Sequence, residues 1–356
     1  MIDYGVAPAT DEIEITVFGP GFGEAIAVHV GEGNWFLVDS CLEPESKLPA
    51  SHNYLQRLGV GANQIKAIVA SHWHDDHVRG ISELADLYPD ADFLMSTALN
   101  SAEAVAFLSA HNDSAAPGLT RGANEIYKVL KKRDNVFHVH QRSSILELTA
   151  NSRNIRVTAL SPVPAAFAQS IVHFAQYLPD KKGGSPVNHA PELKPNLEAI
   201  AIHIDFDGDA ALLGSDLEDH HSCGWTAVVS DAWCTARRPG SAYKVAHHGS
   251  RTGEQAEIWT TLLEQGPSIS MTPFNLGSVK LPTDEDRVRI RSKSDDAYIS
   301  SGASKRPQMD AAVLKRLGDV CNKLTRVNAG FGAIRLRKQI GAKSWAAELF
   351  GDACIL

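Results

Sequence analysis

The sequence lacks the features of a disulfide scaffold, a secreted precursor and a membrane protein. Its five cysteines contain no Cys-x-x-Cys pair, and a chain of 356 residues can bury a core without a disulfide framework. The first residues show neither a basic nor an apolar signal segment, and no apolar run approaches the ~20 residues that cross a bilayer. We therefore expect a reducing, cytoplasmic setting and no membrane contact.

Basic residues are fewer than acidic residues. The chain carries 34 Lys plus Arg against 42 Asp plus Glu, which is a net charge of -8. Proteins that coat nucleic acids rely on clustered Lys and Arg, so this balance disfavours a long duplex as partner and leaves a short single strand or a nucleotide open. We interpret Arg237, Arg238 and the basic residues of 287–293 as solvated faces rather than as a basic groove.

What the sequence does contain is an alternation of short apolar runs and helical segments. Hydrophobic residues make up 44% of the chain, enough for a sizeable core. The apolar runs predict strands at 12–18, 25–30, 35–38, 65–70, 93–95, 136–140, 155–160, 199–205, 210–213, 242–246, 269–272 and 333–336. Helices are predicted at 51–58, 81–87, 101–110 and 311–324. This order indicates a layered α/β architecture, with an irregular insert at 179–195 as a candidate flap.

The most informative segment is the loop that follows the buried strand at 65–70. It places four possible metal ligands within six residues: His72, His74, Asp76 and His77. Imidazole nitrogens and a carboxylate oxygen suit zinc, with manganese or iron as alternatives. We expect His72 and His74 to share one ion while Asp76 and His77 face a second. Two divalent ions about 3.5–4 Å apart can hold a bridging hydroxide that attacks a substrate.

Two later segments add candidate ligands at the ends of apolar strands. The strand at 210–213 leads into Asp216, a carboxylate suited to bridge two ions. The strand at 242–246 leads into His247 and His248, and both are candidate ligands. We favour His247 because it leaves the strand first, which leaves His248 for the substrate or for a supporting contact.

The pattern His-x-His-x-Asp-His at 72–77 matches the signature motif of the metallo-β-lactamase superfamily. This resemblance implies an α/β fold of the αββα type, in which two mixed β-sheets are flanked by helices. It also implies two divalent metal ions, with Asp216 as the carboxylate that bridges them. Asp39, after the apolar run at 35–38, is similar to the aspartate that supports the metal loop from behind.

A closer similarity is to the hydrolase domain of the ComEC-like DNA-uptake (competence) proteins and their stand-alone relatives. The segments 21–25, 214–218 and 247–250 carry it, and 158–162 and Asn196 are also similar. It covers about residues 12–300, so we expect one hydrolase domain over 1–300 and a C-terminal extension, 301–356, that packs on it. The resemblance implies phosphodiester hydrolysis of DNA, RNA or a nucleotide messenger.

The sequence departs from the superfamily at the first ion. The family supplies a third histidine to this ion from a segment just before the hairpin that leads to the bridging aspartate. Here the matching place carries Asn196, and His189 lies a few residues earlier in the irregular insert. His189, Asn196 or a water is left to complete the site, so we expect this ion to be held more weakly than the second.

The reaction expected from these residues is metal-dependent hydrolysis, with a phosphodiesterase or nuclease favoured. Asp76 or Asp216 would handle a proton, while His247 or His248, Ser250 and Lys244 would contact an anionic substrate oxygen. Ser250 and Lys244, like Asp39, are also candidates for supporting the metal ligands from behind. A small-molecule hydrolase of a lactone, ester or amide is the alternative, and an apolar pocket without clustered Arg or Lys would distinguish it. A catalytically silent metal-binding module is the third reading and would need a damaged ligand set. No residue indicates a protein partner or an oligomeric state.

Overall fold

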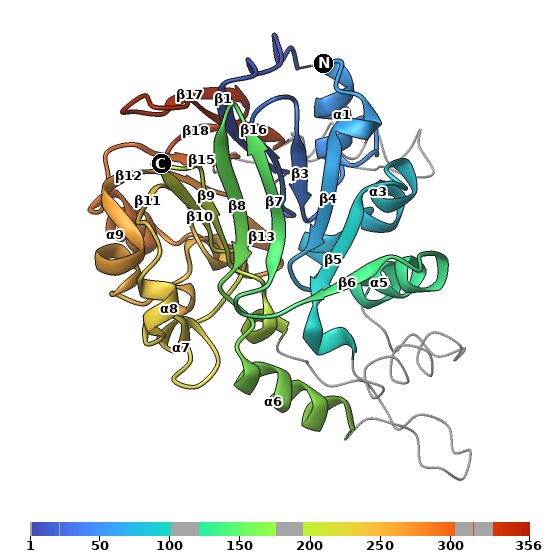
Figure 1. The fold of residues 1–356 in the computed structure, drawn as a ribbon, viewed down its shortest axis with the longest axis vertical. Helices are drawn as coiled ribbons and strands as arrows, with labels where there is room; N and C mark the ends of the chain where they lie inside the picture. The colour runs from blue at the N-terminus through green and yellow to red at the C-terminus, as the bar shows by residue number, and fades with distance from the viewer. Residues whose placement is uncertain (1, 21, 101–120, 176–194, 303–315, 317–329) are drawn as a thin grey trace.

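Two eight-stranded β-sheets lie face to face, with helices on their outer sides (Figure 1). The computed structural model describes residues 2–20, 22–100, 121–175, 195–302, 316 and 330–356. The predicted helices at 101–110 and 311–324, nearly all of the insert at 179–195, and His189 lie outside the described residues. The two facing sheets with helices on their outer sides confirm the αββα architecture that the resemblance implied.

The first sheet is antiparallel on one side and parallel on the other. In spatial order its strands are β17 (Ala346–Gly351), β16 (Gly332–Gln339), β1 (Glu12–Gly19), β2 (Ala25–His29), β3 (Trp35–Val38), β4 (Ile65–Ala70), β5 (Asp92–Ser96) and β6 (Val136–Val139). Strands β3 to β6 are parallel to one another, and the others run antiparallel to their neighbours. Parallel strands are covered on both faces, which explains the continuous apolar runs of β3 and β4.

The second sheet has the same mixed character. In spatial order its strands are β18 (Cys354–Ile355), β15 (Ala297–Ile299), β12 (Leu263–Met271), β11 (Gly240–Lys244), β10 (Ala210–Leu213), β9 (Ile202–Asp205), β8 (Arg153–Ala159) and β7 (Ser144–Ala150). Strands β10, β11, β12 and β15 are parallel. A separate hairpin, β13 (Phe274–Leu276) with β14 (Val279–Leu281), follows β12.

Helices cover the outer faces of both sheets. Those beside the first sheet are α1 (Ala50–Arg57), α2 (Asp75–Val78), α3 (Ile81–Leu87) and α5 (Arg121–Lys132), and those near the second are α6 (Pro164–Ala175), α7 (Trp225–Val229), α8 (Ala232–Thr235) and α9 (Asp284–Arg291). Short helical turns are η1 (Ala62–Gln64), η2 (Thr97–Asn100), η3 (Pro195–Glu198), η4 (His247–Gly249), η5 (Arg251–Gly253) and η6 (Ile258–Leu262). No helix among the described residues is both long enough and apolar enough to cross a membrane.

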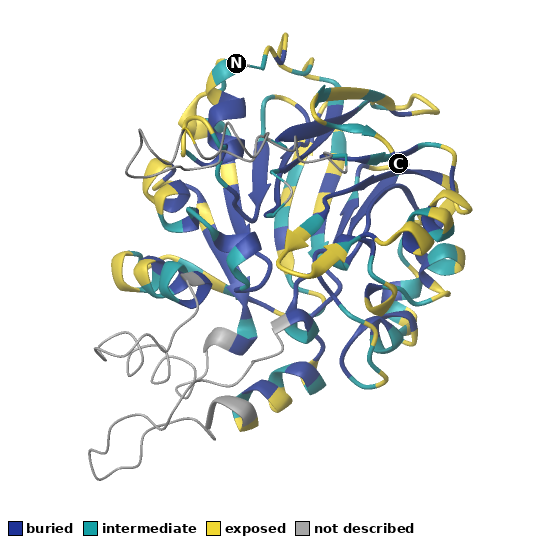
Figure 2. Cartoon of the chain, turned by 180° about the vertical axis from the view of Figure 1, so that it is seen from behind, coloured by how far each residue is buried: buried dark blue, intermediate teal, exposed yellow. Residues whose placement is uncertain are grey.

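Buried side chains form three clusters that follow these layers. One lies between the sheets and contains Val17, Phe36 and Leu213. The other two lie between each sheet and its helices, around Tyr54 on one side and Trp225 on the other. The central strands of both sheets are accordingly buried over most of their length, whereas strands at the sheet edges, such as β7 and β17, have exposed residues (Figure 2). Apolar burial on this scale supplies the main driving force for folding.

The end of the chain returns to both sheets. Strand β16 pairs antiparallel with β1 along its full length, from Glu12 opposite Gln339 to Gly19 opposite Gly332, and β18 extends the second sheet beside β15. The carboxylate of Glu14, buried in β1, accepts a hydrogen bond from Arg337 Nε at 2.6 Å. A short apolar run near the C-terminus predicted one strand at 333–336, but the pairing partner could not be read from it.

Candidate metal centre

The loop between β4 and α2 is held from behind by Asp39. Ser71 donates its backbone N–H to Asp39 Oδ1 and its hydroxyl to Asp39 Oδ2, each at 2.7 Å. His77 Nδ1 donates to Asp39 Oδ2 at 2.7 Å. Asp39 is completely buried and has a positive φ of 60° at the end of β3. A carboxylate is the side chain that can accept all three donors, and it leaves His77 with Nε2 turned forward.

Four side chains converge in front of this loop. Asp76, His77, Asp216 and His248 each offer one ligand atom, and these atoms lie within 4.8 Å of one another. His248 Nε2 lies 3.0 Å from Asp76 Oδ2 and 3.4 Å from Asp216 Oδ2. His77 Nε2 lies 3.2 Å from Asp216 Oδ1. Two imidazoles and two carboxylates at this spacing form a donor set for a divalent cation.

A second group shares Asp216 with the first. It consists of His72, His74 and Asp216, with His72 Nε2 at 3.2 Å from His74 Nδ1. The Ser71 hydroxyl donates to Asp39, so it accepts from His72 Nδ1 at 3.0 Å. This contact sets the tautomer that leaves Nε2 of His72 as a lone-pair donor. Asp216 therefore stands between two groups, as the bridging role requires.

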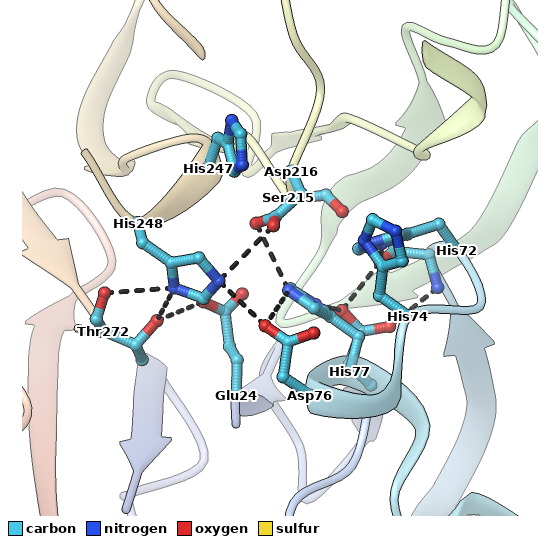
Figure 3. A network of polar contacts seen from close by, with 12 residues as sticks. Glu24, His72, His74, Asp76, His77, Ser215, Asp216, His247, His248 and Thr272 are labelled. Carbon is cyan, nitrogen blue, oxygen red and sulfur yellow. Dashed lines mark hydrogen bonds and ion pairs between the residues drawn. The ribbon is translucent and has the colours of Figure 1, made fainter. Parts of the chain in front are cut away.

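His248 is oriented by a buried chain of polar contacts. Its Nδ1 lies 3.2 Å from the backbone oxygen of Thr272 and 3.0 Å from the Thr272 hydroxyl. That hydroxyl donates to Glu24 Oε2 at 2.5 Å, and Lys244 Nζ lies 2.5 Å from the same oxygen. The Nδ1 proton of His248 is thereby directed to Thr272, and Nε2 faces the carboxylates (Figure 3).

The structure reverses the order that we expected for the paired histidines. His247 belongs to neither group; its Nδ1 lies 2.8 Å from Thr252 Oγ1 and 3.3 Å from Glu218 Oε1. Both histidines have left-handed backbone angles, with φ of 46° and 52°. The chain turns so sharply that the second side chain, not the first, reaches Asp76 and Asp216. Figure 3 shows the His247 ring turned away from them.

Asn196 lies beside His247. Its Nδ2 donates to Glu218 Oε1 at 3.0 Å and lies 3.3 Å from His247 Nε2. Its Oδ1 is buried and has no hydrogen-bond partner among the residues that the structure describes. Asn196 thus presents a free amide oxygen, and the other candidate for this place, His189, lies outside the described residues.

Two predicted substrate contacts have other partners. The Lys244 side chain is fully buried against Glu24, so it supports the site from behind, as the sequence also suggested, and does not reach a substrate. The Ser250 hydroxyl accepts from the backbone N–H of Thr252 at 3.3 Å and caps η5. Sequence reasoning missed Thr272 and the role of Glu24, because neither has a spacing that relates it to His248.

The basic run at 287–293 lies on and just beyond α9. Arg289 forms ion pairs with Glu254 and Asp286, and its Nη2 donates to the backbone oxygen of Gly249 at 2.7 Å. Val288 on this helix is 72% exposed. This arginine supports the turn that follows His248 instead of forming an open basic groove.

The pKa values of the histidines at the centre are shifted in opposite directions. Burial, helped by the neighbouring His77, lowers the pKa of His72 well below its usual value. Burial by itself lowers the pKa of His248, but Asp216 and Asp76 outweigh burial and raise it to about 9. The carboxylates raise the pKa of His77 in the same way. A metal ion that binds Nε2 of His77 or His248 would compete with a proton for the same nitrogen.

Several buried polar atoms at the centre have no hydrogen-bond partner among the described residues. They include Ser215 Oγ and Asn196 Oδ1, and also His77 Nε2 and Asp216 Oδ1, which lie 3.2 Å apart without the geometry of a hydrogen bond. Buried polar atoms are costly to leave unpaired, and three of these four belong to the predicted ligand set. The donor types and their unpaired atoms fit divalent metal ions.

The comparison with protein families agrees with this geometry. Residues 18–110 match the family model described as "Metallo-beta-lactamase superfamily". The matched part includes β2 to β5 and the whole metal loop, so this part of the chain is similar to that superfamily. No curated protein matches the chain.

Solved structures similar to the chain include enzymes and a protein named for its fold. A mutant of the CmlA beta-hydroxylase is 15% identical with a TM-score of 0.34, over 67% of this chain and 36% of that one. MEM-A1, a subclass B3 metallo-beta-lactamase isolated from a soil metagenome library, is 14% identical with a TM-score of 0.36, over 73% and 87%. The metallo-beta-lactamase fold protein YhfI from Bacillus subtilis is 13% identical with a TM-score of 0.38, over 81% and 95%.

Proposed function

We propose that this protein is a metal-dependent hydrolase of phosphodiesters, acting on a nucleotide or a short nucleic acid. The observation that carries the proposal is the position of Asp216, which belongs both to the group of Asp76, His77 and His248 and to the group of His72 and His74. A carboxylate shared by two donor sets is the arrangement that a pair of divalent ions needs.

We assign one ion to Asp76, His77, Asp216 and His248, and the other to His72, His74 and Asp216. The free Oδ1 of Asn196 is the candidate for completing the second of these sets. The nitrogen and oxygen donors favour zinc, with manganese or iron as alternatives. When bound, such ions supply an activated water at neutral pH and stabilise negative charge that develops on the substrate.

The protein contributes orientation and a place for the proton. Asp39 and Thr272 fix the tautomers of His77 and His248, so both rings present Nε2 to the front. Asp76 uses Oδ2 toward His248, and its Oδ1 has no hydrogen bond with any described residue. We assign the transfer of the proton from the attacking water to Asp76, because a buried carboxylate with a free oxygen beside the site can accept it.

The choice of a phosphodiester rests on the similarity of residues 21–25, 214–218 and 247–250 to the ComEC-like hydrolases. The small-molecule alternative, a hydrolase of a lactone, ester or amide, is favoured by one observation. Lys244 is buried against Glu24 and offers no charge to a substrate phosphate. A catalytically silent module is disfavoured, because the two donor sets are complete except at the place of Asn196.

We also propose that the chain works in a reducing, cytoplasmic setting. Cys41, Cys223, Cys234 and Cys354 are free thiols, and three of them are buried. The proposed partner is the phosphodiester substrate itself, and we assign no protein partner.

The test is hydrolysis of bis-p-nitrophenyl phosphate and of labelled single-stranded DNA by protein reconstituted with Zn²⁺ or Mn²⁺. The variant Asp76→Ala/His77→Ala should lose activity and bound metal. His140→Ala/His221→Ala, which removes two exposed histidines away from both groups, should keep both. No cleavage by wild-type protein that holds two ions would overturn the phosphodiesterase and direct the work to lactones and esters.

A further inference from the structure

Two phenylalanines and an arginine from distant parts of the sequence meet beside His248. Phe274, the first residue of β13, has its ring centroid 5.4 Å from that of His248 and 5.3 Å from that of Phe22. Arg79, which ends α2, places its guanidinium carbon 5.3 Å from the centre of the Phe22 ring. Phe22, Arg79 and Phe274 are all only partly buried. They form an aromatic wall that begins at a proposed metal ligand.

The backbone holds this wall against the metal loop. Glu24 donates its backbone N–H to the backbone oxygen of Asp76 at 2.8 Å. A Cβ on Gly23 would lie 2.9 Å from the Cβ of Cys41 and 3.3 Å from that same oxygen. Gly23 also has a φ of +123°, so only glycine fits this approach. Phe274 follows Thr272, whose oxygen orients His248, by two residues. Both rings are therefore fixed relative to Asp76 and His248.

Arg79 differs from the arginines that have a carboxylate partner. Arg57, Arg142, Arg289 and Arg337 each form an ion pair with a carboxylate. Arg79 forms none with the described residues; its recorded partner is the Phe22 ring, and its backbone oxygen accepts from Ser40 Oγ at 2.9 Å. An arginine without a carboxylate partner is free to bind a phosphate through two N–H groups.

The apolar surface continues outward along the hairpin. Leu276 and Val279 are paired across β13 and β14 and are 54% and 49% exposed. A contiguous exposed apolar pair beside a catalytic centre indicates a surface that contacts a ligand. The wall thus combines aromatic faces, an apolar extension and one unpaired cation.

We propose that Phe22, Phe274 and Arg79 form a subsite for a nucleoside phosphodiester, in which a single unstacked base lies on the phenylalanines and Arg79 binds a phosphate oxygen. This deepens the proposed function and rests on it. Aromatic side chains hold bases through their π-faces without regard to sequence, and the scarcity of positive charge elsewhere is no obstacle to a ligand of one or a few nucleotides.

The experiment compares two esters that share a leaving group, thymidine 5′-(p-nitrophenyl phosphate) and methyl p-nitrophenyl phosphate. We expect metal-reconstituted wild-type protein to favour the nucleoside ester by about tenfold or more in kcat/KM, the scale of one base on an aromatic ring. Phe22→Leu and Phe274→Leu should reduce this preference toward one, because kcat/KM for the nucleoside ester falls much further than kcat/KM for the methyl ester. Arg79→Gln should slow both esters, because both contain the phosphate.

Phe137→Leu is the matched control, because Phe137 is 49% exposed on β6 and belongs to neither the metal centre nor the wall. Equal metal content and thermal unfolding show that each variant is folded. A calorimetric titration of dTMP against methyl phosphate gives a second readout, with dTMP binding weakened in Phe274→Leu. Equal rates for the two esters in wild type, or a preference retained by Phe22→Leu/Phe274→Leu, would overturn the subsite. If neither ester is cleaved the proposed function fails, and the dTMP titration still decides the subsite.

Discussion

Lys244 Nζ lies 2.5 Å from Glu24 Oε2, and neither side chain is exposed to solvent. The lysine ends β11 of the second sheet and the glutamate precedes β2 of the first, so this ion pair joins the two sheets directly behind the metal centre. Glu24 Oε2 also accepts from Thr272, which orients His248. An ion pair in this position stabilises the orientation of the metal ligand His248 and does not contact the substrate.

Lys244→Met should destabilise the protein strongly, because it leaves the Glu24 charge buried without a partner. Breaking a buried pair in this way costs about 3–5 kcal/mol. Adding Glu24→Gln to the same protein should restore most of the lost stability, since the amide can still accept from Thr272. Urea unfolding of the two single variants and the double variant measures the coupling. Additive effects of the two substitutions would contradict this assignment.

Asp39→Asn should weaken metal binding while the fold persists. The amide offers one oxygen where Ser71 and His77 need acceptors at both Oδ1 and Oδ2, so one donor meets an N–H group. Loss of such a supporting contact typically costs about 10–100-fold in metal affinity. Competition with a chromophoric chelator measures the change, and His221→Ala, an exposed site, should bind as the wild type does. Unchanged affinity in Asp39→Asn would show that Asp39 does not orient His77.

The two adjacent histidines should behave differently when the metal is counted. His248→Ala should lose about one of the two metal equivalents, because its Nε2 is a donor beside Asp76 and Asp216. His247→Ala should retain both, because its ring contacts Thr252, Glu218 and Asn196 instead. Elemental analysis after gel filtration gives the count. If His247→Ala lost a metal equivalent and His248→Ala did not, His247 would be the metal ligand, as the sequence led us to expect.

Glu198, at the end of η3, should make stability depend on pH. Burial raises its pKa from 4.5 to about 8 in the folded protein. Between about pH 5 and 8 the unfolded chain has lost this proton and the folded protein keeps it. The free energy of unfolding should therefore fall as the pH rises through this window and level off above it.

Glu198→Gln removes this proton, so its unfolding free energy should change less between pH 5 and 8 than that of the wild type. Urea unfolding of both proteins after removal of metal by a chelator compares the slopes, and Glu83→Gln on an exposed face of α3 is the control. Parallel curves for Glu198→Gln and wild type would show that Glu198 is ionised in the folded state.

Local patterns account for the part of the site that the sequence could predict. His72, His74, Asp76 and His77 come from one loop, and a strand followed by a loop of fixed length can bring such neighbours together whatever surrounds them. Asp216 also follows directly from an apolar strand. The same logic holds for the buried strands, whose continuous apolar runs require cover on both faces.

The contacts that these residues make depend on backbone turns and on segments that are remote in the sequence. Nothing in the order of His247 and His248 reveals that both adopt a left-handed backbone, and that turn determines which ring faces Asp76. Lys244 was expected at the substrate, yet β2 places Glu24 against it from the opposite sheet. Phe22 and Phe274 are far apart in the sequence and meet because β1, β2 and β12 lead to the same edge of the sandwich.

Apolar periodicity and residues a few positions apart were enough to predict the layered α/β class, the ligand types and the loop that carries them. Four features could be read only from the folded protein: the histidine that joins the carboxylates, the partner of Lys244, the strand that pairs with β1 and the side chains beside the proposed metal sites. Those outcomes depend on backbone turns and on contacts between segments that are remote in the chain, and no local pattern encodes them.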